Sequence, residues 1–296
     1  MQQSIGASIA AAQKFYRFGD WFHFLGFTFL GILFGARSSD LDFLLVTEAM
    51  IASSLLLAFA YSFNVLYDSE VESSMLPSHN ATTPGRLRGL LLSLAPAAVG
   101  LALVVRSSEA FFMGLLFVVL WGLYSGPVLR LKAVPLLCTI SNGVGFSLLF
   151  LIGLAMVATF STSSILFFSL LVLLEIPAQL IHEVAHSQGD KLLGVNTSAV
   201  QYGDKRSLEG AVLSLAGAIV LAVVMSMQGI VNVLTALSAG SFSSIFLLLF
   251  LLERQSPALA AGSSEESLAK RFRSLRAQYR CGGILAGSIF AVGLLL

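Results

Sequence analysis

The sequence predicts an all-α integral membrane protein, a bundle of about nine transmembrane helices with a cytoplasmic cap, in a single domain over residues 1–296. Three observations indicate this fold. The chain is 56% hydrophobic and only 11% charged, and its mean hydropathy is +0.87, which leaves too little polar surface for a water-soluble domain. Apolar windows of bilayer-crossing length recur along the chain. Positive charges also gather in alternate connections between these windows.

The apolar windows place the predicted spans in chain order. They are residues 20–36, 43–63, 89–105, 110–126, 134–158, 164–185, 210–228, 232–252 and 281–296. Residues 1–17 are interpreted as a short interfacial helix rather than a cleavable signal peptide. The reason is that they carry Lys14 and Arg17 and lead into a span too long and aromatic for a signal sequence.

The positive charges test this count, because Lys and Arg are enriched in the cytoplasmic connections of membrane proteins. With the N-terminus inside, only Arg37 and Arg106 of the 17 Lys and Arg residues fall outside. We therefore expect a multi-pass cell-membrane protein with a cytoplasmic N-terminus and an external C-terminus. The inner loops 64–88 and 186–209 would form the cap. The basic stretch 268–276 is interpreted either as an amphipathic helix on the anionic inner leaflet or as a solvated linker.

A first polar cluster follows the second span. Asn64, Asp68 and Glu72 have the spacing i, i+4, i+8, which places them on one side of a continued helix. Carboxylate and amide oxygens suit Mg²⁺, which usually shares its coordination with substrate phosphates. The cluster therefore predicts a diphosphate-binding metal site.

A second cluster ends the sixth span. Gln179, Glu183, His186 and Asp190 are separated by 4, 3 and 4 residues and share a helical face, with His182 beside them. Two such faces could hold one diphosphate between two metal ions. The alternative is that both clusters are solvated where spans leave the lipid, although polar clusters inside a bundle are usually functional.

Other functional classes find little support in the sequence. The net charge is +1, and no basic run with interleaved aromatic residues occurs outside 268–276, so nucleic acid is not an expected partner. Cys138 and Cys281 lie in or beside apolar stretches. We interpret them as small core residues rather than as a disulfide or a metal pair.

Both clusters resemble the acidic motifs of the UbiA superfamily of intramembrane prenyltransferases. The family motifs are Asn-Asp-x-x-Asp-x-x-x-Asp and Asp-x-x-Asp-x-x-x-Asp, and the matching stretches here are Asn64-Val65-x-x-Asp68-x-x-x-Glu72 and Glu183-x-x-His186-x-x-x-Asp190. Val65 departs from the first motif and His186 from the second, and two glutamates replace aspartates. Imidazole is a softer ligand than carboxylate. His186 could therefore bind metal or donate to the diphosphate, with Glu183 and Asp190 as the ligands.

Further stretches carry the same resemblance. They are Leu123-Tyr124-Ser125-Gly126-Pro127-x-x-Arg130-Leu131-Lys132, Asn142, Lys191-x-x-Gly194-x-x-Thr197, Tyr202-Gly203-Asp204-Lys205 and, more weakly, Pro84-Gly85-Arg86.

The resemblance implies transfer of an isoprenyl chain from an isoprenyl diphosphate to a lipophilic acceptor in the lipid bilayer, with Mg²⁺ neutralising the leaving diphosphate. The implied catalytic residues are Asp68, Asp190, Lys132 and Tyr124. The implied metal ligands are Asn64, Asp68, Glu72, Glu183, His186 and Asp190. The implied substrate-binding residues are Asn64, Arg130, Asn142, Lys191, His182 and Gln179.

Several of these residues have a plainer interpretation. Any one of the basic residues could serve only to orient the protein in the membrane, and Tyr124 and Tyr61 could be interfacial anchors. Asn142 could bond to a neighbouring helix. For the whole chain, the alternative is a non-catalytic descendant that binds or carries isoprenoid lipids, which Val65 and His186 favour. Polar clusters at the ends of spans, rather than at the bilayer midplane, favour the enzyme.

Overall fold

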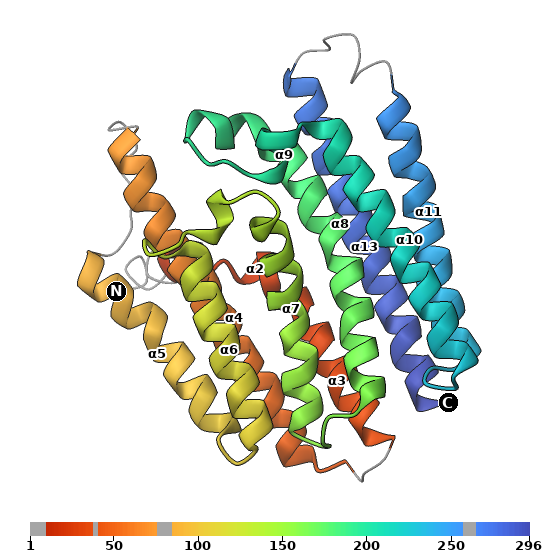
Figure 1. Ribbon diagram of the computed structural model, residues 1–296. Helices are drawn as coiled ribbons and strands as arrows, with labels where there is room; N and C mark the ends of the chain where they lie inside the picture. The colour runs from red at the N-terminus through yellow and green to blue at the C-terminus, as the bar shows by residue number, and fades with distance from the viewer. Residues whose placement is uncertain (1–9, 38–40, 76–84, 257–264) are drawn as a thin grey trace. The chain divides into compact units, whose positions relative to one another are not determined.

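The structure is a computed structural model that describes residues 10–37, 41–75, 85–256 and 265–296, with the backbone alone at 69–75 and 265. Within these ranges every regular element is helical (Figure 1). The elements are α2 (Phe18–Trp21), η1 (Phe22–Phe24), α3 (Leu25–Ala36), α4 (Phe43–Met75), α5 (Arg86–Val104), α6 (Ser108–Ser125), η2 (Leu131–Ala133), α7 (Leu137–Ala155), α8 (Thr162–Leu192), α9 (Ser198–Tyr202), α10 (Asp204–Met227), α11 (Val233–Gln255) and α13 (Glu265–Leu295).

The predicted number of spans is confirmed in the described part of the chain. Nine helices there are long and apolar enough to cross a membrane. The helices do not stop where the apolar windows stop, however. α4 continues to Met75 and α8 to Leu192, because the residues that follow each window still favour a helical backbone. The predicted cytoplasmic cap is therefore not confirmed, since much of the two proposed loops is helix.

The basic stretch 268–276 forms the first turns of α13 and continues directly into the last span. The linker interpretation is therefore wrong. Phe272 and Tyr279 are buried in this part of the helix, and α13 packs against α8 and α11. Arg276 interacts electrostatically with Glu175 of α8. Part of the stretch therefore faces neighbouring helices. This differs from the other interpretation as well, in which the stretch is a separate helix lying on the inner leaflet.

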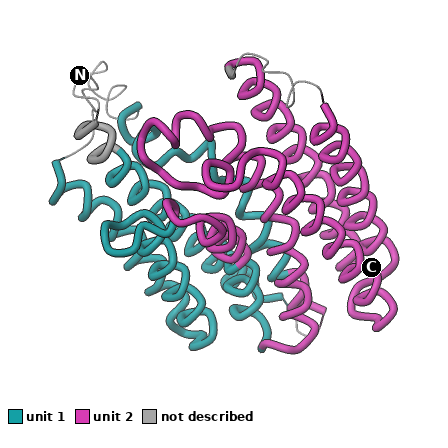
Figure 2. Tube along the Cα trace, turned by 45° about the horizontal axis from the view of Figure 1, so that its top comes forward, with its two compact units in different colours: residues 1–32, 39–131, 148–159 teal, residues 33–38, 132–147, 160–296 magenta. Residues whose placement is uncertain are grey.

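The helices group into two compact units (Figure 2). Unit 1 comprises Met1–Ile32, Ser39–Leu131 and Leu148–Thr159, and in it α4 packs on α5 and α6. Unit 2 comprises Leu33–Ser38, Lys132–Ser147 and Phe160–Leu296. In unit 2, α8 contacts α10 and α13, and α11 contacts the same two helices, so these four helices close a ring. That the whole chain is one domain stays a prediction.

A proline inside α8 is compensated by the two helices beside it. Pro177 has no N–H, so the carbonyl of Leu173, four residues earlier, lacks its usual helical donor. The Ser214 hydroxyl of α10 donates to that carbonyl at 2.7 Å, and the Tyr279 hydroxyl of α13 donates to the carbonyl of Leu174 at 2.7 Å. Hydrocarbon offers no water to satisfy such groups. The interruption therefore becomes a point at which three helices are joined.

The Ser214 bond gives a stability prediction. Ser214→Ala should lower the free energy of unfolding by about 1 kcal/mol, because the Leu173 carbonyl loses its substitute donor. In a Pro177→Ala background the cost should be smaller, since residue 177 then supplies its own N–H. A double-mutant cycle by denaturation in mixed micelles measures both values. Ser169→Ala, whose hydroxyl bonds to Ile165 within α8, is the control. Equal costs in the two backgrounds would contradict this account.

Candidate functional site

The first-motif group, Asn64 and Asp68, lies on α4 in unit 1. The helix is continuous through both residues, so their spacing of four places them on the same side, one turn apart. Both side chains are partly exposed. α4 also carries Glu72, whose side chain lies outside the described residues. The described part of the group thus offers one amide and one carboxylate.

Ser125, the last residue of α6, orients the amide of Asn64. The Asn64 Nδ2 donates to the buried Ser125 hydroxyl at 3.1 Å. The donor side of the amide therefore faces α6, and its oxygen is turned away from Ser125. α6 ends next to Ser125 at Gly126, where an added Cβ would collide with the Gly122 carbonyl. Ser125 thus orients the Asn64 amide, and the neighbouring Gly126 marks the end of α6.

Two tyrosines of unit 1 have different surroundings. Tyr124 is 8% exposed, and its ring packs edge-on against Trp121 with centroids 5.0 Å apart. This burial disfavours the interpretation of Tyr124 as an interfacial anchor. Tyr61 lies under the guanidinium of Arg17, which is 5.8 Å from the ring centroid. Arg130, which follows α6 in the same unit, has a left-handed backbone with φ of 44°, which is uncommon for a residue with a side chain.

The second-motif group, Gln179, Glu183, His186 and Asp190, follows one side of α8 in unit 2. Gln179 and Glu183 are buried, whereas His186 is exposed and Asp190 is partly exposed. His182 and His186 are neighbours, with ring centroids 4.5 Å apart. α8 ends soon after Asp190, and Gly194 then takes the left-handed conformation with φ of 65°.

The carboxylate of Glu183 accepts hydrogen bonds from four donors. Its Oε1 accepts from Thr139 Oγ1 at 2.7 Å, from Gln179 Nε2 at 3.2 Å and from Cys138 Sγ at 3.3 Å. Its Oε2 accepts from the backbone N–H of Ser198 at 2.9 Å. With only 1% of the residue exposed, this buried acid is satisfied entirely by the protein.

Ser198 extends this network to the segment before α7. The N–H of Leu136 donates to the Ser198 hydroxyl at 3.0 Å. The Ser198 and Thr139 hydroxyls are 2.9 Å apart, and since Thr139 gives its proton to Glu183, Ser198 is the donor between them. Sequence reasoning missed Thr139 and Ser198, because an isolated hydroxyl in or beside an apolar helix gives no signal of its own.

Lys132 is the basic residue of this segment. It is 9% exposed. Burial lowers the pKa of its amine to about 8, while the charge of the Asp190 carboxylate acts in the opposite direction and raises it. Asp190 and Lys132 are therefore electrostatically coupled. Of the other predicted residues, Asn142 is partly buried in α7, and Lys191 is exposed in the last turn of α8.

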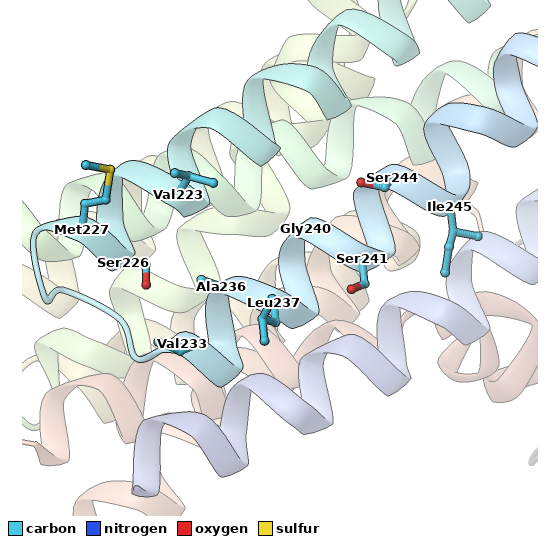
Figure 3. A pocket seen from close by; sticks show the side chains of 10 residues that line it. All are labelled: Val223, Ser226, Met227, Val233, Ala236, Leu237, Gly240, Ser241, Ser244 and Ile245. Carbon is cyan, nitrogen blue, oxygen red and sulfur yellow. The ribbon is translucent and has the colours of Figure 1, made fainter.

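A groove on unit 2 contains none of the predicted site residues. It has a volume of about 660 Å³ and lies between α10 and α11 (Figure 3). Its lining is apolar except for Ser226, Ser241 and Ser244, with no titratable side chain. The groove therefore offers no group for acid–base or metal chemistry.

The residues present fit Mg²⁺ unevenly. In the portion of the chain that is described, no three His, Cys, Asp or Glu side chains converge on a metal-binding point. The oxygen donors of Asn64, Asp68 and Asp190 are of the type that Mg²⁺ prefers. His186 offers nitrogen, and the oxygens of Glu183 are already engaged by protein donors.

Comparison with known proteins gives the family. The sequence profile of the UbiA prenyltransferase family matches residues 24–263. No curated protein matches the chain. Several solved structures share the fold. One is a UbiA homologue from Archaeoglobus fulgidus bound to DMAPP and Mg²⁺, with 18% identity, a TM-score of 0.71, and coverage of 94% of this chain and 99% of that one.

Two further structures extend the comparison. Digeranylgeranylglyceryl phosphate synthase has 17% identity and a TM-score of 0.71, covering 97% of this chain and 98% of that one. A UbiA homologue from Aeropyrum pernix K1 has 13% identity and a TM-score of 0.58, covering 87% and 95%. At these identities the structures show the fold alone, whereas the sequence profile spans most of the chain. This multi-pass membrane protein belongs to the UbiA prenyltransferase family.

Proposed function

We propose that this protein transfers an isoprenyl chain from an isoprenyl diphosphate to a lipophilic acceptor within the membrane. The observation that carries the proposal is the pair Asn64 and Asp68, an amide and a carboxylate on one side of a membrane helix, with the amide oriented by Ser125. Family membership supports prenyl transfer. A solved relative bound to GPP and Mg²⁺ supports the class of donor.

Mg²⁺, when bound, would neutralise the negative charge that grows on the diphosphate as its bond to the isoprenyl carbon breaks. Asp68 and Asn64 would hold it in the first motif, with Glu72 as a further proposed ligand. Asp190 would do so in the second motif, where His186 is a nitrogen ligand or a donor to the diphosphate. Apart from His186, these ligands are oxygen donors, which suit a hard cation.

Basic side chains would bind the diphosphate oxygens directly. The protonated Lys132 amine is buried, so a charge-assisted hydrogen bond from it is less weakened by water than one at the surface. Arg130 and Lys191 would add cationic contacts, and Gln179, His182 and Asn142 polar ones. Tyr124 would present its ring to the allylic cation, because the ring is enclosed by protein rather than lipid.

The alternative function, a non-catalytic protein that binds or carries isoprenoid lipids, also has an observation in its favour. In the second motif, His186 replaces an acid and the Glu183 carboxylate is engaged by four protein donors. Asp190 is then the only second-motif carboxylate not held in that way.

The membrane orientation, with the N-terminus cytoplasmic and the C-terminus outside, remains a proposal that rests on the distribution of Lys and Arg.

The first test is Asp68→Asn. We expect a loss of diphosphate release of about a hundredfold or more, because the change removes a charged metal ligand at almost constant volume. Release from a panel of isoprenyl diphosphates, with Mg²⁺ or with EDTA, measures it in purified protein. Asp42→Asn is the control, since Asp42 caps the start of α4 through the Leu44 N–H and asparagine can keep that bond. Full activity in Asp68→Asn would remove Asp68 from the site.

The second test is His186→Asp. We expect activity to be preserved or raised, and the Mg²⁺ concentration for half-maximal activity to fall, because a carboxylate binds Mg²⁺ better than an imidazole does. His186→Asn, which is polar but uncharged, should not show this gain. Lower activity in His186→Asp would indicate a dedicated role for the imidazole.

The third test is Ser125→Ala, which removes the hydroxyl that orients Asn64. The Mg²⁺ concentration for half-maximal activity should rise about tenfold, as expected when a partner of a metal ligand is lost. Ser54→Ala on α4, the helix that carries Asn64, is the matched control, because the Ser54 hydroxyl bonds to the Met50 carbonyl one turn away. An unchanged Mg²⁺ dependence in Ser125→Ala would show that the Asn64 amide needs no such support.

A further inference from the structure

Glu183 has a different setting from the other acids of the two motifs. Asp68 and Asp190 are partly exposed, whereas Glu183 is 1% exposed. A carboxylate has about four lone-pair positions, and that of Glu183 accepts four hydrogen bonds. Three of these bonds fall on Oε1, and a metal ion at that oxygen would have to displace buried donors, which would then lack partners.

The four donors come from three segments of unit 2. Thr139 and Cys138 belong to the first turn of α7, Gln179 lies one turn before Glu183 on α8, and Ser198 begins α9. A single side chain therefore ties the start of α7 and the chain that follows α8 to α8 itself. Burial within the protein strengthens each of these bonds, because water does not compete for the donors.

The same network holds the segment that carries Lys132. Leu136, which precedes α7, has a left-handed backbone with φ of 64° and donates its N–H to Ser198. Ser198 is in turn held by the Glu183 carboxylate through its own N–H. The buried Lys132 lies four residues before Leu136, so its segment is linked to Glu183 through Leu136 and Ser198.

We propose that Glu183 is a positioning residue rather than a metal ligand. It fixes two segments onto α8: the Lys132 segment, residues 131–136, and the Ser198 turn, residues 198–202 of α9. Its effect on the substrate rests on the proposed function, because it acts through Lys132 as a diphosphate-binding group. Its effect on the fold does not depend on that function. The two parts can therefore be tested separately.

The first measurement is the thermal unfolding midpoint of purified protein in EDTA. Glu183→Gln should lower it by roughly 5 °C or more, because glutamine sets an NH₂ donor against one of the existing donors. Thr139→Val, which removes one donor at constant shape, should lower the midpoint less. Thr139→Ser, which keeps the hydroxyl, should have a midpoint close to that of the wild type. Ser141→Ala is the control on α7, since the Ser141 hydroxyl bonds within the helix to Leu137 and Cys138.

The second measurement is the rate at which N-ethylmaleimide labels Cys138 in EDTA, in a Cys281→Ser background that removes the exposed thiol. Cys138 is buried and donates to Glu183, so labelling reports local opening of the network. Glu183→Gln and Thr139→Val should raise the rate about tenfold. If Glu183→Gln does not fold, Thr139→Val carries both measurements.

The third measurement separates positioning from stability. At a temperature where all variants are folded, Thr139→Val should bind inorganic pyrophosphate several-fold more weakly in EDTA, and Thr139→Ser should bind it normally. Mn²⁺ affinity should fall strongly in Asp190→Asn and much less in Glu183→Gln. The positioning role is overturned if Glu183→Gln leaves the midpoint and the labelling rate unchanged and loses Mn²⁺ as Asp190→Asn does. If the wild type binds neither pyrophosphate nor Mn²⁺, the proposed function fails, while the first two measurements still decide the role of Glu183.

Discussion

A carboxylate buried in a membrane protein persists only where the protein replaces the water it has lost. Glu183 meets this condition with donors from three segments, including the backbone N–H of Ser198. The arrangement works in both directions, because the acid needs its donors and the donors would be unsatisfied without the acid. The start of α7, the end of α8 and the Ser198 turn are consequently fixed together, and Lys132 is fixed with them.

The same constraint explains how α8 tolerates a proline. In water, the carbonyl exposed by Pro177 would bond to solvent, but in hydrocarbon it must find a protein donor. The Ser214 hydroxyl of α10 donates to this carbonyl, and the Tyr279 hydroxyl of α13 donates to the next carbonyl, that of Leu174. α8 is therefore joined to its surroundings by polar contacts both at the proline and at Glu183, and the residues Gln179 to Asp190 lie on a helix whose placement is well determined within unit 2.

The chemistry expected of the family makes opposite demands on its acidic residues. A metal ligand has to present its oxygens to an ion and to substrate. The oxygens of a residue that stabilises the fold instead accept hydrogen bonds from protein donors. In the proposed assignment Asp68 and Asp190, which are partly exposed, would meet the first demand, and the buried Glu183 would meet the second. Membership of a motif therefore does not by itself give a residue its role. As proposed, the second motif of this chain would divide into a positioning residue, Glu183, and two more exposed residues, His186 and Asp190, which would contact ligands.

The sequence by itself determined the membrane class, the number of spans found in the described residues and the helical faces of the two motifs. Hydropathy and the 3.6-residue period suffice for this because they are local properties of the chain. Even there the apolar windows underestimated α4 and α8, since a helix can continue beyond the lipid. Only the tertiary structure decided which donors surround Glu183, that Ser125 orients Asn64, and that Ser214 replaces the N–H missing at Pro177. These are contacts between residues distant in sequence, made by ordinary serines and threonines. Their significance arises solely from the burial that folding imposes on them.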